Sequence, residues 1–459
     1  MFDQNIAKDA IDFSGSSETS GSFRSDVALT FATRLLMLLG VVGSSVIAGR
    51  YLGPKGLGTL AVLNATVMLA LQIGSGGLPS ANTYFIAKDR QSFGPVWANT
   101  IVFAFAAGSI LAVLVATVAE SATTLFGDVS TRLLAIAAIS IPFQLLTLLG
   151  LNVLLAMDRI AEMNFLDSMA PAAILVNAIV VLLILKGKLT MLVSFNTAAA
   201  ILLSLSLVLV IRRLLPRQKE GRKFRPDFRL FKTMLAYGMK FYISIMAGFV
   251  IFRADLLIVN HFRGAGEAGI YAVASQVSFL LLMMPGVIAT LLFPRVATRQ
   301  DPTGEFAVQV TRHASFVMLI MCTAAAAGSF ALPLIYGAPF ADATNQLLIL
   351  LPGVYLVGLE SVLVQHFTGT GLPFAIPLFW LITMVLNVAL NLTFVPVWGA
   401  RAAALNSTLS YALIFVLVAV HFCRQTGRQP QEIFLLHGSE LRNVLAKIHF
   451  SSLLGKVHE

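Results

Sequence analysis

Charged residues are scarce in this chain. Only 12% of its 459 residues are Asp, Glu, Lys or Arg, about half the share that soluble domains usually carry. The hydrophobic fraction is 57% and the mean hydropathy is +0.84, which is too high for a chain that buries one core in water. The composition therefore excludes an ordinary soluble domain and predicts that most of the chain lies in lipid.

Cysteine and the common catalytic motifs are also missing. The two cysteines, Cys322 and Cys423, provide neither a disulfide framework nor a metal-ligand spacing. The sequence contains no Walker-type, Rossmann-type, HExxH or Ser/His/Asp motif, and the stretches between its hydrophobic runs are too short for an enzyme domain. We therefore expect a protein without catalytic activity, cofactor or bound metal.

The chain instead contains a series of apolar runs, each long enough to cross a hydrocarbon core of about 30 Å. Twelve such runs lie at residues 26–49, 57–86, 95–118, 132–157, 162–185, 189–211, 233–260, 267–293, 308–335, 343–367, 373–396 and 400–422. The sequence thus predicts an all-α integral membrane protein with twelve transmembrane helices.

Polar segments divide this series into two sets of six spans. We predict a disordered cytoplasmic tail at 1–24, a six-helix bundle at 25–211, a basic cytoplasmic linker at 212–232, a second six-helix bundle at 233–423 and a cytoplasmic tail at 424–459. In that last tail, Leu441, Leu445 and Ile448 would share one side of an amphipathic helix on the inner leaflet. The alternative is a loosely ordered tail.

The distribution of basic residues predicts the orientation. With the N-terminus inside, twenty-one Lys and Arg fall on the cytoplasmic side, seven fall outside, and four lie within spans. This bias places both termini in the cytoplasm. The net charge of +10 does not indicate nucleic acid as a partner, because the basic residues alternate with apolar runs along the chain.

An internal repeat relates the two sets of spans. The segment YLGPKGLGTLAV (51–62) matches the segment FRGAGEAGIYAV (262–273) at an offset of 211, and each joins the first span of its set to the second. The offset pairs two glycines of each segment, Gly53 with Gly264 and Gly58 with Gly269. Because six is an even number, both sets enter the membrane in the same sense, and we expect a pseudo-two-fold axis along the membrane normal.

The same offset relates two predicted helix breaks. The second span of the first set is interrupted by Gly74, Gly76 and Gly77, and that of the second set by Pro285 and Gly286. Interrupted spans at corresponding positions of two halves point to the central site of a transporter. The alternative is a pair of kinks that only help the helices to pack.

The repeat segments resemble those of a known family. AGRYLGPKGLGTLAVLNATV and ADLLIVNHFRGAGEAGIYAVASQV…PGVIATLLFPRVA are similar to the polysaccharide-unit (Wzx-type) flippases of the multidrug/oligosaccharidyl-lipid/polysaccharide exporter superfamily. Members typically show an Asp in the seventh span, then Gly, Gly-x-Tyr and Phe-Pro, which correspond here to Asp255, Gly264, Gly269, Tyr271 and Phe293-Pro294. They usually have a basic residue directly after the Asp, whereas this chain has Leu256 there and Arg253 before it.

The resemblance implies a fold like that of the multidrug and toxic-compound extrusion (MATE) transporters, with a lumen between two bundles and alternating access. The implied cargo is an oligosaccharide on undecaprenyl diphosphate, moved across the bacterial inner membrane for exopolysaccharide, capsule or O-antigen synthesis. Membrane lipids, a polysaccharide polymerase and export machinery are the implied partners.

Five charged residues within spans are candidates for transport, because a charge at mid-bilayer costs at least about 2.5–3.5 kcal/mol. Arg34, Lys240 and Arg253 are the candidate ligands of a lipid diphosphate, although each could instead snorkel to headgroups or pair across a helix interface. Asp255 and Glu360 are the candidate ion-coupling carboxylates, for H⁺ or Na⁺, and Glu360 could instead be simply hydrogen-bonded. At about 100° per residue, Lys240 and Asp255 share a helix face that Arg253 does not.

Three other classes of membrane protein usually have features that this sequence lacks. A MATE-type ion-coupled multidrug antiporter usually needs an acidic lumen, whereas cations outnumber carboxylates among the five candidates. A polysaccharide polymerase or ligase needs a sizeable outside loop, and a peptidoglycan-precursor flippase usually has fourteen spans. The sequence therefore favours a flippase of lipid-linked oligosaccharides, with the MATE-type antiporter as the alternative.

Overall fold

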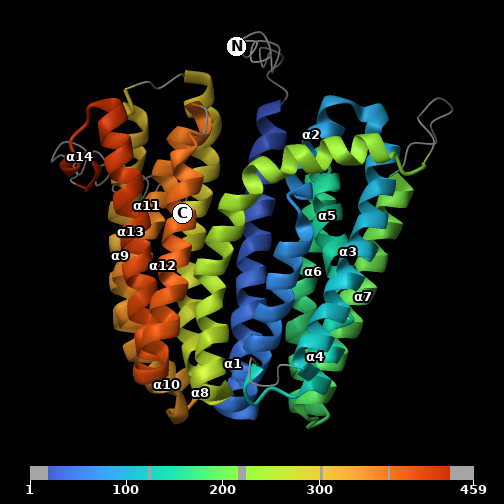
Figure 1. Cartoon of the computed structure of the whole chain (residues 1–459), viewed down its shortest axis with the longest axis vertical. Coiled ribbons are helices and arrows are strands. Elements are labelled where there is room, and N and C mark those ends of the chain that lie inside the picture. Colours follow the sequence, from blue (N-terminus) through green and yellow to red (C-terminus); the bar gives the residue numbers. More distant parts are fainter. Residues whose placement is uncertain (1–18, 122–125, 215–223, 300–302, 371–372, 435–459) are drawn as a thin grey trace, which may run out of the picture.

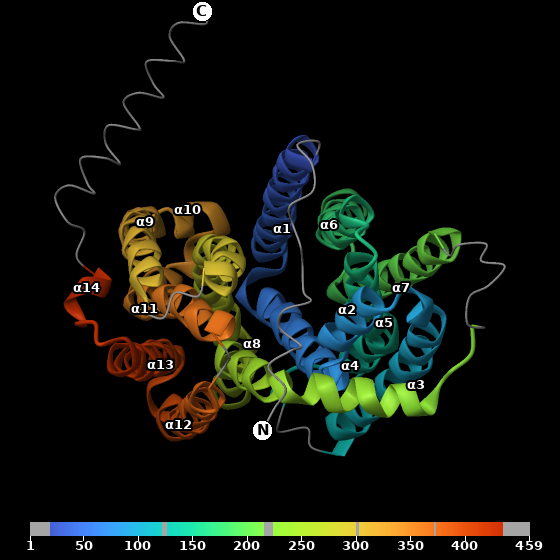
Figure 2. The same ribbon diagram turned by 90° about the horizontal axis from the view of Figure 1, so that it is seen from above.

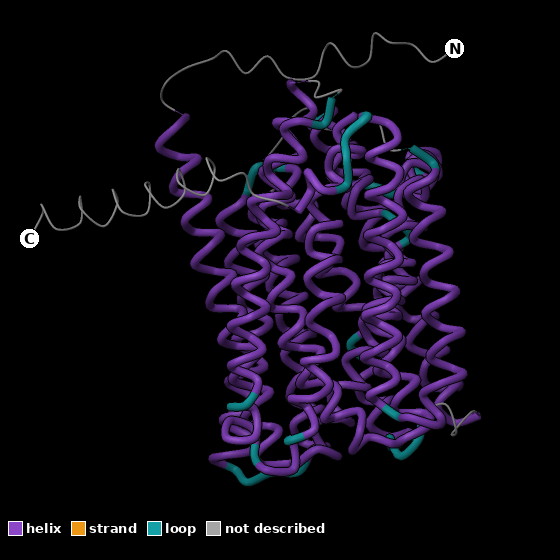
Figure 3. Tube along the Cα trace, turned by 90° about the vertical axis from the view of Figure 1, so that its left-hand side faces the viewer, coloured by secondary structure: helices purple, strands orange, loops and turns teal. Residues whose placement is uncertain are grey.

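The structure is a computed structural model that describes residues 19–121, 126–214, 224–299, 303–370 and 373–434. Within these ranges the long helices run side by side and roughly parallel (Figures 1 and 3). Ten of the helices described there are long and apolar enough to cross a membrane. The predicted fold class, an all-α membrane protein, is confirmed.

The helices follow one another in an order close to that of the predicted spans. In the first half of the chain they are α1 (Thr19–Ser75), α2 (Leu78–Lys88), α3 (Phe93–Ser121), α4 (Thr131–Ala138), α5 (Ile141–Ala156), α6 (Ile160–Ala178) and α7 (Leu189–Leu214). In the second half they are α8 (Phe228–Arg299), α9 (Glu305–Ser329), α10 (Leu332–Tyr336), α11 (Asp342–Thr370), α12 (Ala375–Trp398), α13 (Ala400–Thr426) and α14 (Gln431–Phe434). Single turns of other helix types are η1 (Arg90–Ser92), η3 (Ile179–Ile184) and η4 (Ala338–Phe340).

Two of these helices, α1 and α8, are each divided into two long arms by one glycine. Gly53 has φ 68° and Gly264 has φ 82°, a left-handed conformation that glycine adopts readily. The apolar stretch of α8 is 45 residues long, or about 67 Å at 1.5 Å per residue, which is too long for one crossing. Both helices turn back at the same end of the molecule (Figure 1), which supports the twelve predicted crossings. Their number and their division into two bundles stay predictions.

Helices α1 and α8 pack along each other in the middle of the molecule. Viewed from above, α2 to α7 lie on one side of this pair and α9 to α13 lie on the other (Figure 2). One large cluster of buried side chains extends through the second half and across the α1–α8 contact. A smaller cluster joins α2, α3 and α5. The centre of the molecule is therefore formed by the two helices that contain the repeat segments.

The start of α8 is fixed by two polar residues of different elements. Asp227 accepts hydrogen bonds at its carboxylate from the backbone N–H groups of Arg229 (2.9 Å) and Leu230 (3.1 Å), which makes it the N-cap of the helix. The amide side chain of Asn99, on α3, bonds both the N–H and the C=O of Asp227, each at 2.9 Å. The first turns of α8 therefore lie across the ends of the first-half helices (Figures 1 and 2).

Some predicted boundaries differ from the structure. Helix α1 begins at Thr19, inside the stretch 1–24 that we predicted to be a tail, and residues 1–18 lie outside the described ranges. The predicted linker 212–232 is partly helical, because α7 continues to Leu214 and α8 already begins at Phe228. The predicted amphipathic helix around Leu441, Leu445 and Ile448 also lies outside the described residues.

The two predicted helix breaks have different outcomes. In the first half, Gly74 is the penultimate residue of α1, and Gly76 and Gly77 form a turn with φ values of 54° and 74° before α2. In the second half, α8 continues through Pro285 and Gly286, so the break predicted there is wrong. The physical reason is that membrane helices tolerate proline where neighbouring helices and local adjustments satisfy the backbone groups that it frees. The Pro285 ring packs beside Gly358 of α11, where an added Cβ would lie 3.4 Å from the ring.

Candidate functional site

Asp255 is the centre of a buried polar cluster in the second half of the chain. It is 2% exposed and accepts hydrogen bonds from the hydroxyl groups of Tyr271 and Ser407, the latter at 3.1 Å. Tyr271 lies on the second arm of α8, which turns back at Gly264 and so returns to the level of Asp255, and Ser407 comes from α13. The cluster therefore joins both arms of α8 to α13.

Arg253 lies beside this cluster without entering it. Its guanidinium carbon is 4.2 Å from the centre of the Phe279 ring, a distance typical of a cation–π contact. The charges of Arg253 and Asp255 attract each other, although their side chains have different contacts, as the spacing of two residues predicted. Arg253 thus balances part of the charge of Asp255 although it lies on a different face of the helix.

Glu360 is a buried residue of α11 near Trp380. It is 2% exposed, and its Oε1 has no hydrogen-bond partner among the described residues. The side chain that donates toward its carboxyl group is Trp380 of α12. The Trp380 ring also covers Gly248 of α8, where an added Cβ would lie 3.3 Å from the ring. Glu360 is therefore linked through one indole to the arm of α8 that carries Asp255.

A row of amide side chains between α12 and α13 was not predicted from the sequence. Asn406 donates to Asn391 (3.2 Å), Asn391 donates to Asn387 (3.2 Å), and Asn387 donates to Ser410 (3.0 Å). Each of these side chains is at most 3% exposed. The sequence contains an indication of this row, because Asn387 and Asn391 lie four residues apart within one predicted span. Asparagines in membrane helices often hydrogen-bond to a neighbouring helix. This row fixes α13, and with it Ser407, against α12.

For two of the five candidate residues, the structure describes the position of the backbone only. Arg34 lies in the first arm of α1 and Lys240 in the first arm of α8, the two helices that pack together in the middle of the molecule. Their side chains are outside what the structure describes. The structure brings Arg253 and Asp255 together with Tyr271, and it places Glu360 separately, on α11.

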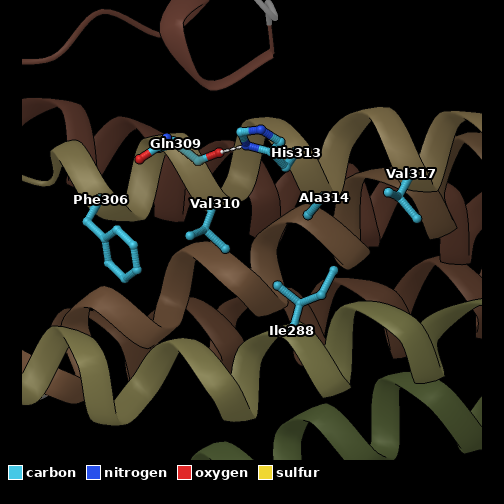
Figure 4. Close-up of a pocket in the computed structure, with 7 residues that line it drawn as sticks. All are labelled: Ile288, Phe306, Gln309, Val310, His313, Ala314 and Val317. Atoms are coloured by element: carbon cyan, nitrogen blue, oxygen red, sulfur yellow. Dashed lines mark hydrogen bonds between the residues drawn. The ribbon is translucent and has the colours of Figure 1, made fainter. Parts of the chain in front are cut away.

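An apolar groove of about 330 Å³ lies between α8 and α9 (Figure 4). Its lining is Ile288, Phe306, Gln309, Val310, His313, Ala314 and Val317. His313 Nδ1 donates to the backbone carbonyl of Gln309 at 2.7 Å, so the ring is turned along its own helix. No metal-binding group of three or more His, Cys, Asp or Glu is found among the described residues.

Comparison with known proteins assigns the chain to a family. A family model described as polysaccharide biosynthesis protein matches residues 24–300, which is more than half of the chain. The chain belongs to this family. The resemblance predicted from the repeat segments is thereby confirmed.

One curated relative also matches this member of the polysaccharide biosynthesis family. The probable low-salt glycan biosynthesis flippase Agl15 of Haloferax volcanii is 21% identical over 201 residues, which are 42% of this chain and 43% of the relative. The match thus spans less than half the length of either protein.

Solved structures with a similar fold are transporters. Lipid II flippase MurJ in an inward closed conformation has a TM-score of 0.70 and 15% identity, over 87% of this chain and 89% of that chain. A multidrug resistance MATE family transporter of the MOP superfamily, in an inward-facing conformation, has a TM-score of 0.66 and 14% identity, over 88% and 99% of the two chains. The fold is therefore the MATE-like fold that the resemblance implied.

Proposed function

We propose that this protein is a flippase that moves oligosaccharides linked to undecaprenyl diphosphate across the bacterial inner membrane by alternating access. The family assignment to polysaccharide biosynthesis and the fold shared with a lipid II flippase support this proposal. The products would serve exopolysaccharide, capsule or O-antigen synthesis, with a polymerase and export machinery as partners. Both termini would lie in the cytoplasm.

The observation that carries the proposal is the placement of the two intramembrane carboxylates. Asp255 and Glu360 are each 2% exposed and lie in contacts between helices of the second half. Neither therefore presents an open acidic surface to a cationic drug. Arg34 and Lys240, on the two central helices, would remain as the ligands of an anionic diphosphate, because guanidinium and ammonium groups both bind phosphate oxygens.

The test is flipping of a fluorescent polyprenyl-diphosphate oligosaccharide in proteoliposomes, measured with a membrane-impermeant quencher. We expect the wild-type protein to flip this lipid and the R34A/K240A variant to flip it at least about tenfold more slowly, a loss of about 1.4 kcal/mol. The matched control is K88A/R90A, which removes two exposed cations outside the hydrophobic stretches. If wild-type protein does not flip the lipid, the function is wrong. If R34A/K240A behaves like the control, only the diphosphate contacts are wrong.

A MATE-type ion-coupled antiporter is the second candidate function. It is favoured by the buried Glu360, one oxygen of which has no partner among the residues that the structure describes, because an intramembrane carboxyl group that exchanges a proton or Na⁺ is typical of coupled transporters. Efflux of a fluorescent cation from proteoliposomes, driven by a pH or Na⁺ gradient, would support this alternative if it were lost in Glu360→Gln. In a flippase that uses Glu360 for coupling, the same gradients would instead change the rate of lipid flipping.

A further inference from the structure

At the end where α1 and α8 turn back, each half of the chain contacts a connection of the other half. Arg50, three residues before the break in α1, donates to the backbone carbonyls of Leu334 and Ile335 in α10, the latter at 2.6 Å from Nε. Asn260, four residues before the break in α8, donates to the carbonyl of Phe126 at 2.7 Å. One contact therefore runs from the first half to the second, and the other runs back.

The two contacts are related by the repeat. Asn260 lies within one residue of the position that the offset of 211 gives for Arg50. Their acceptors also correspond, because Phe126 precedes α4 in the first half and α10 precedes α11 in the second. Asn260 is 1% exposed, whereas Arg50 is exposed. The same kind of cross-contact is thus formed twice, once by each repeat segment.

Between these two contacts the repeat segments approach each other through their backbones. A Cβ added at Gly58 would lie 1.7 Å from the carbonyl oxygen of Ala265, and one added at Gly269 would lie 2.0 Å from that of Pro54. Pro54 and Ala265 are also 211 positions apart. Only glycine allows this approach, so the glycines matched by the repeat contact each other as well as occupying equivalent positions.

We propose that these contacts form one gate, which consists of the Arg50 and Asn260 cross-contacts and the glycine approach between them. The gate holds this end of the transport path closed and opens when the two halves separate. The inference rests on the alternating access of the proposed function.

The chemistry of the gate suits repeated opening. Its acceptors are backbone carbonyls, which water can hydrate once Arg50 and Asn260 withdraw. Its centre is a backbone contact held by dispersion, in which each atom pair contributes only about 0.1–0.2 kcal/mol. The ion pairs at the same end stay within one half of the chain, as Lys55 with Asp128 and Arg401 with Asp342 show. These pairs do not resist separation of the halves.

The gate can be tested by measuring a distance across it. Spin labels at Arg132 of α4 and Gly328 of α9, in a C322A/C423A background, report the separation of the halves by pulsed electron paramagnetic resonance in lipid nanodiscs without cargo. Both sites are exposed, and an added Cβ at Gly328 meets nothing within 4 Å. We expect R50A/N260A to raise the ratio of a longer-distance population to the closed one by about tenfold, which is about 1.4 kcal/mol.

The matched control is R401A, which removes an arginine at the same end whose partner lies in the same half. It should leave the distance distribution unchanged. The role of the Arg50 and Asn260 cross-contacts in the gate is overturned if R50A/N260A also gives the wild-type distribution, or if R401A shifts it equally.

The glycine approach has its own variants. We expect G58A and G269A to shift the distances toward the longer population, whereas G266A, where an added Cβ meets nothing within 4 Å, should not. If either variant fails to fold, R50A/N260A still tests the gate. Folded G58A protein with wild-type distances would contradict the close approach.

Failure of the gate is distinguishable from failure of the proposed function. The distances are measured without cargo, so they test the gate even if no lipid is flipped. Conversely, a wild-type protein that flips lipid while R50A/N260A leaves the distances unchanged would retain the function and reject the gate.

Discussion

At the residue scale, burial decides how the charged side chains of this protein behave. Asp255 has two hydroxyl donors and an attractive charge at Arg253, which together offset the cost of removing a carboxylate from water. Glu360 has less support, because one of its oxygens is unpartnered among the described residues. The two carboxylates thus have different environments, and separate experiments can examine them.

Removal of the Tyr271 hydroxyl should destabilise the protein. The variant Y271F leaves Asp255 with one donor fewer at a site that water does not reach, which typically costs about 1–3 kcal/mol. The measurement is thermal unfolding of purified protein in detergent. Tyr51, which is 43% exposed, provides the matched control Y51F, and we expect its melting temperature to stay near that of the wild type. Equal melting of Y271F and Y51F would show that the Tyr271 contact does not support the fold.

Trp380 should report the ionisation of Glu360. The chain has three tryptophans, so W97F/W398F leaves Trp380 as the single fluorophore. Because its indole faces the Glu360 carboxyl group, we expect its emission to change with pH, and E360Q should abolish the change. The control E305Q alters an exposed glutamate at the start of α9 and should leave the titration intact. A pH response that persists in E360Q would assign it to another group.

At the element scale, the position of the first turn of α8 depends on an N-cap and on hydrogen bonds from α3. Asp227 caps the helix, and Asn99 holds Asp227 against α3. These contacts place the first turns of α8, where the ring of Tyr237 stacks on Tyr84 with centroids 4.4 Å apart. The second half of the chain is thereby attached to the first at the end opposite the proposed gate.

Loss of the cap should loosen the start of α8. We expect D227A to lower stability by about 1 kcal/mol and D227N to be close to wild type, because Asn and Asp are equally good N-caps. Hydrogen exchange of the peptide that contains residues 228–234 should accelerate in D227A only. Equal exchange in the two variants would show that the carboxylate does not fix this helix end.

At the scale of the whole molecule, the turns gather at two ends of the molecule. The end at which α1 and α8 turn back also contains α10, whereas α2 and α14 lie toward the other end (Figure 1). Gly53 lines a pocket with Tyr336 of α10, and Gly399 contacts Glu267 of α8. Ion pairs link distant connections at both ends, for example Arg90 with Asp158. This arrangement is the one that a multi-pass membrane protein needs, because it leaves the helical backbone bonded within the hydrocarbon layer.

Labelling of single cysteines tests the predicted orientation. In a C322A/C423A background, we expect K55C, K186C and R401C to react with a membrane-impermeant maleimide in intact spheroplasts. Replacements at the opposite end, R90C, R159C and R424C, should react only after permeabilisation. All six positions are charged in the wild type and none is buried. The reverse pattern would contradict the predicted inside termini.

The sequence by itself determined the elements of this protein. Apolar runs predicted the helices because a bilayer selects for length and hydropathy. The repeat segments 51–62 and 262–273 were predicted to join the first span of each half to the second, and they contain the turns that the structure has at Gly53 and Gly264. The break predicted at Pro285 was wrong, because α8 continues there and membrane helices tolerate proline where the freed backbone groups are satisfied by their surroundings.

Only the tertiary structure decided which residues meet. Nothing local to Asp255 indicates that Ser407, 152 residues away, donates to it. The asparagine row and the reciprocal approach of Gly58 and Gly269 likewise depend on how helices from distant segments pack. The physical reason is that helix formation in a membrane follows from each segment alone, whereas contacts between helices depend on the shape and polarity of both partners.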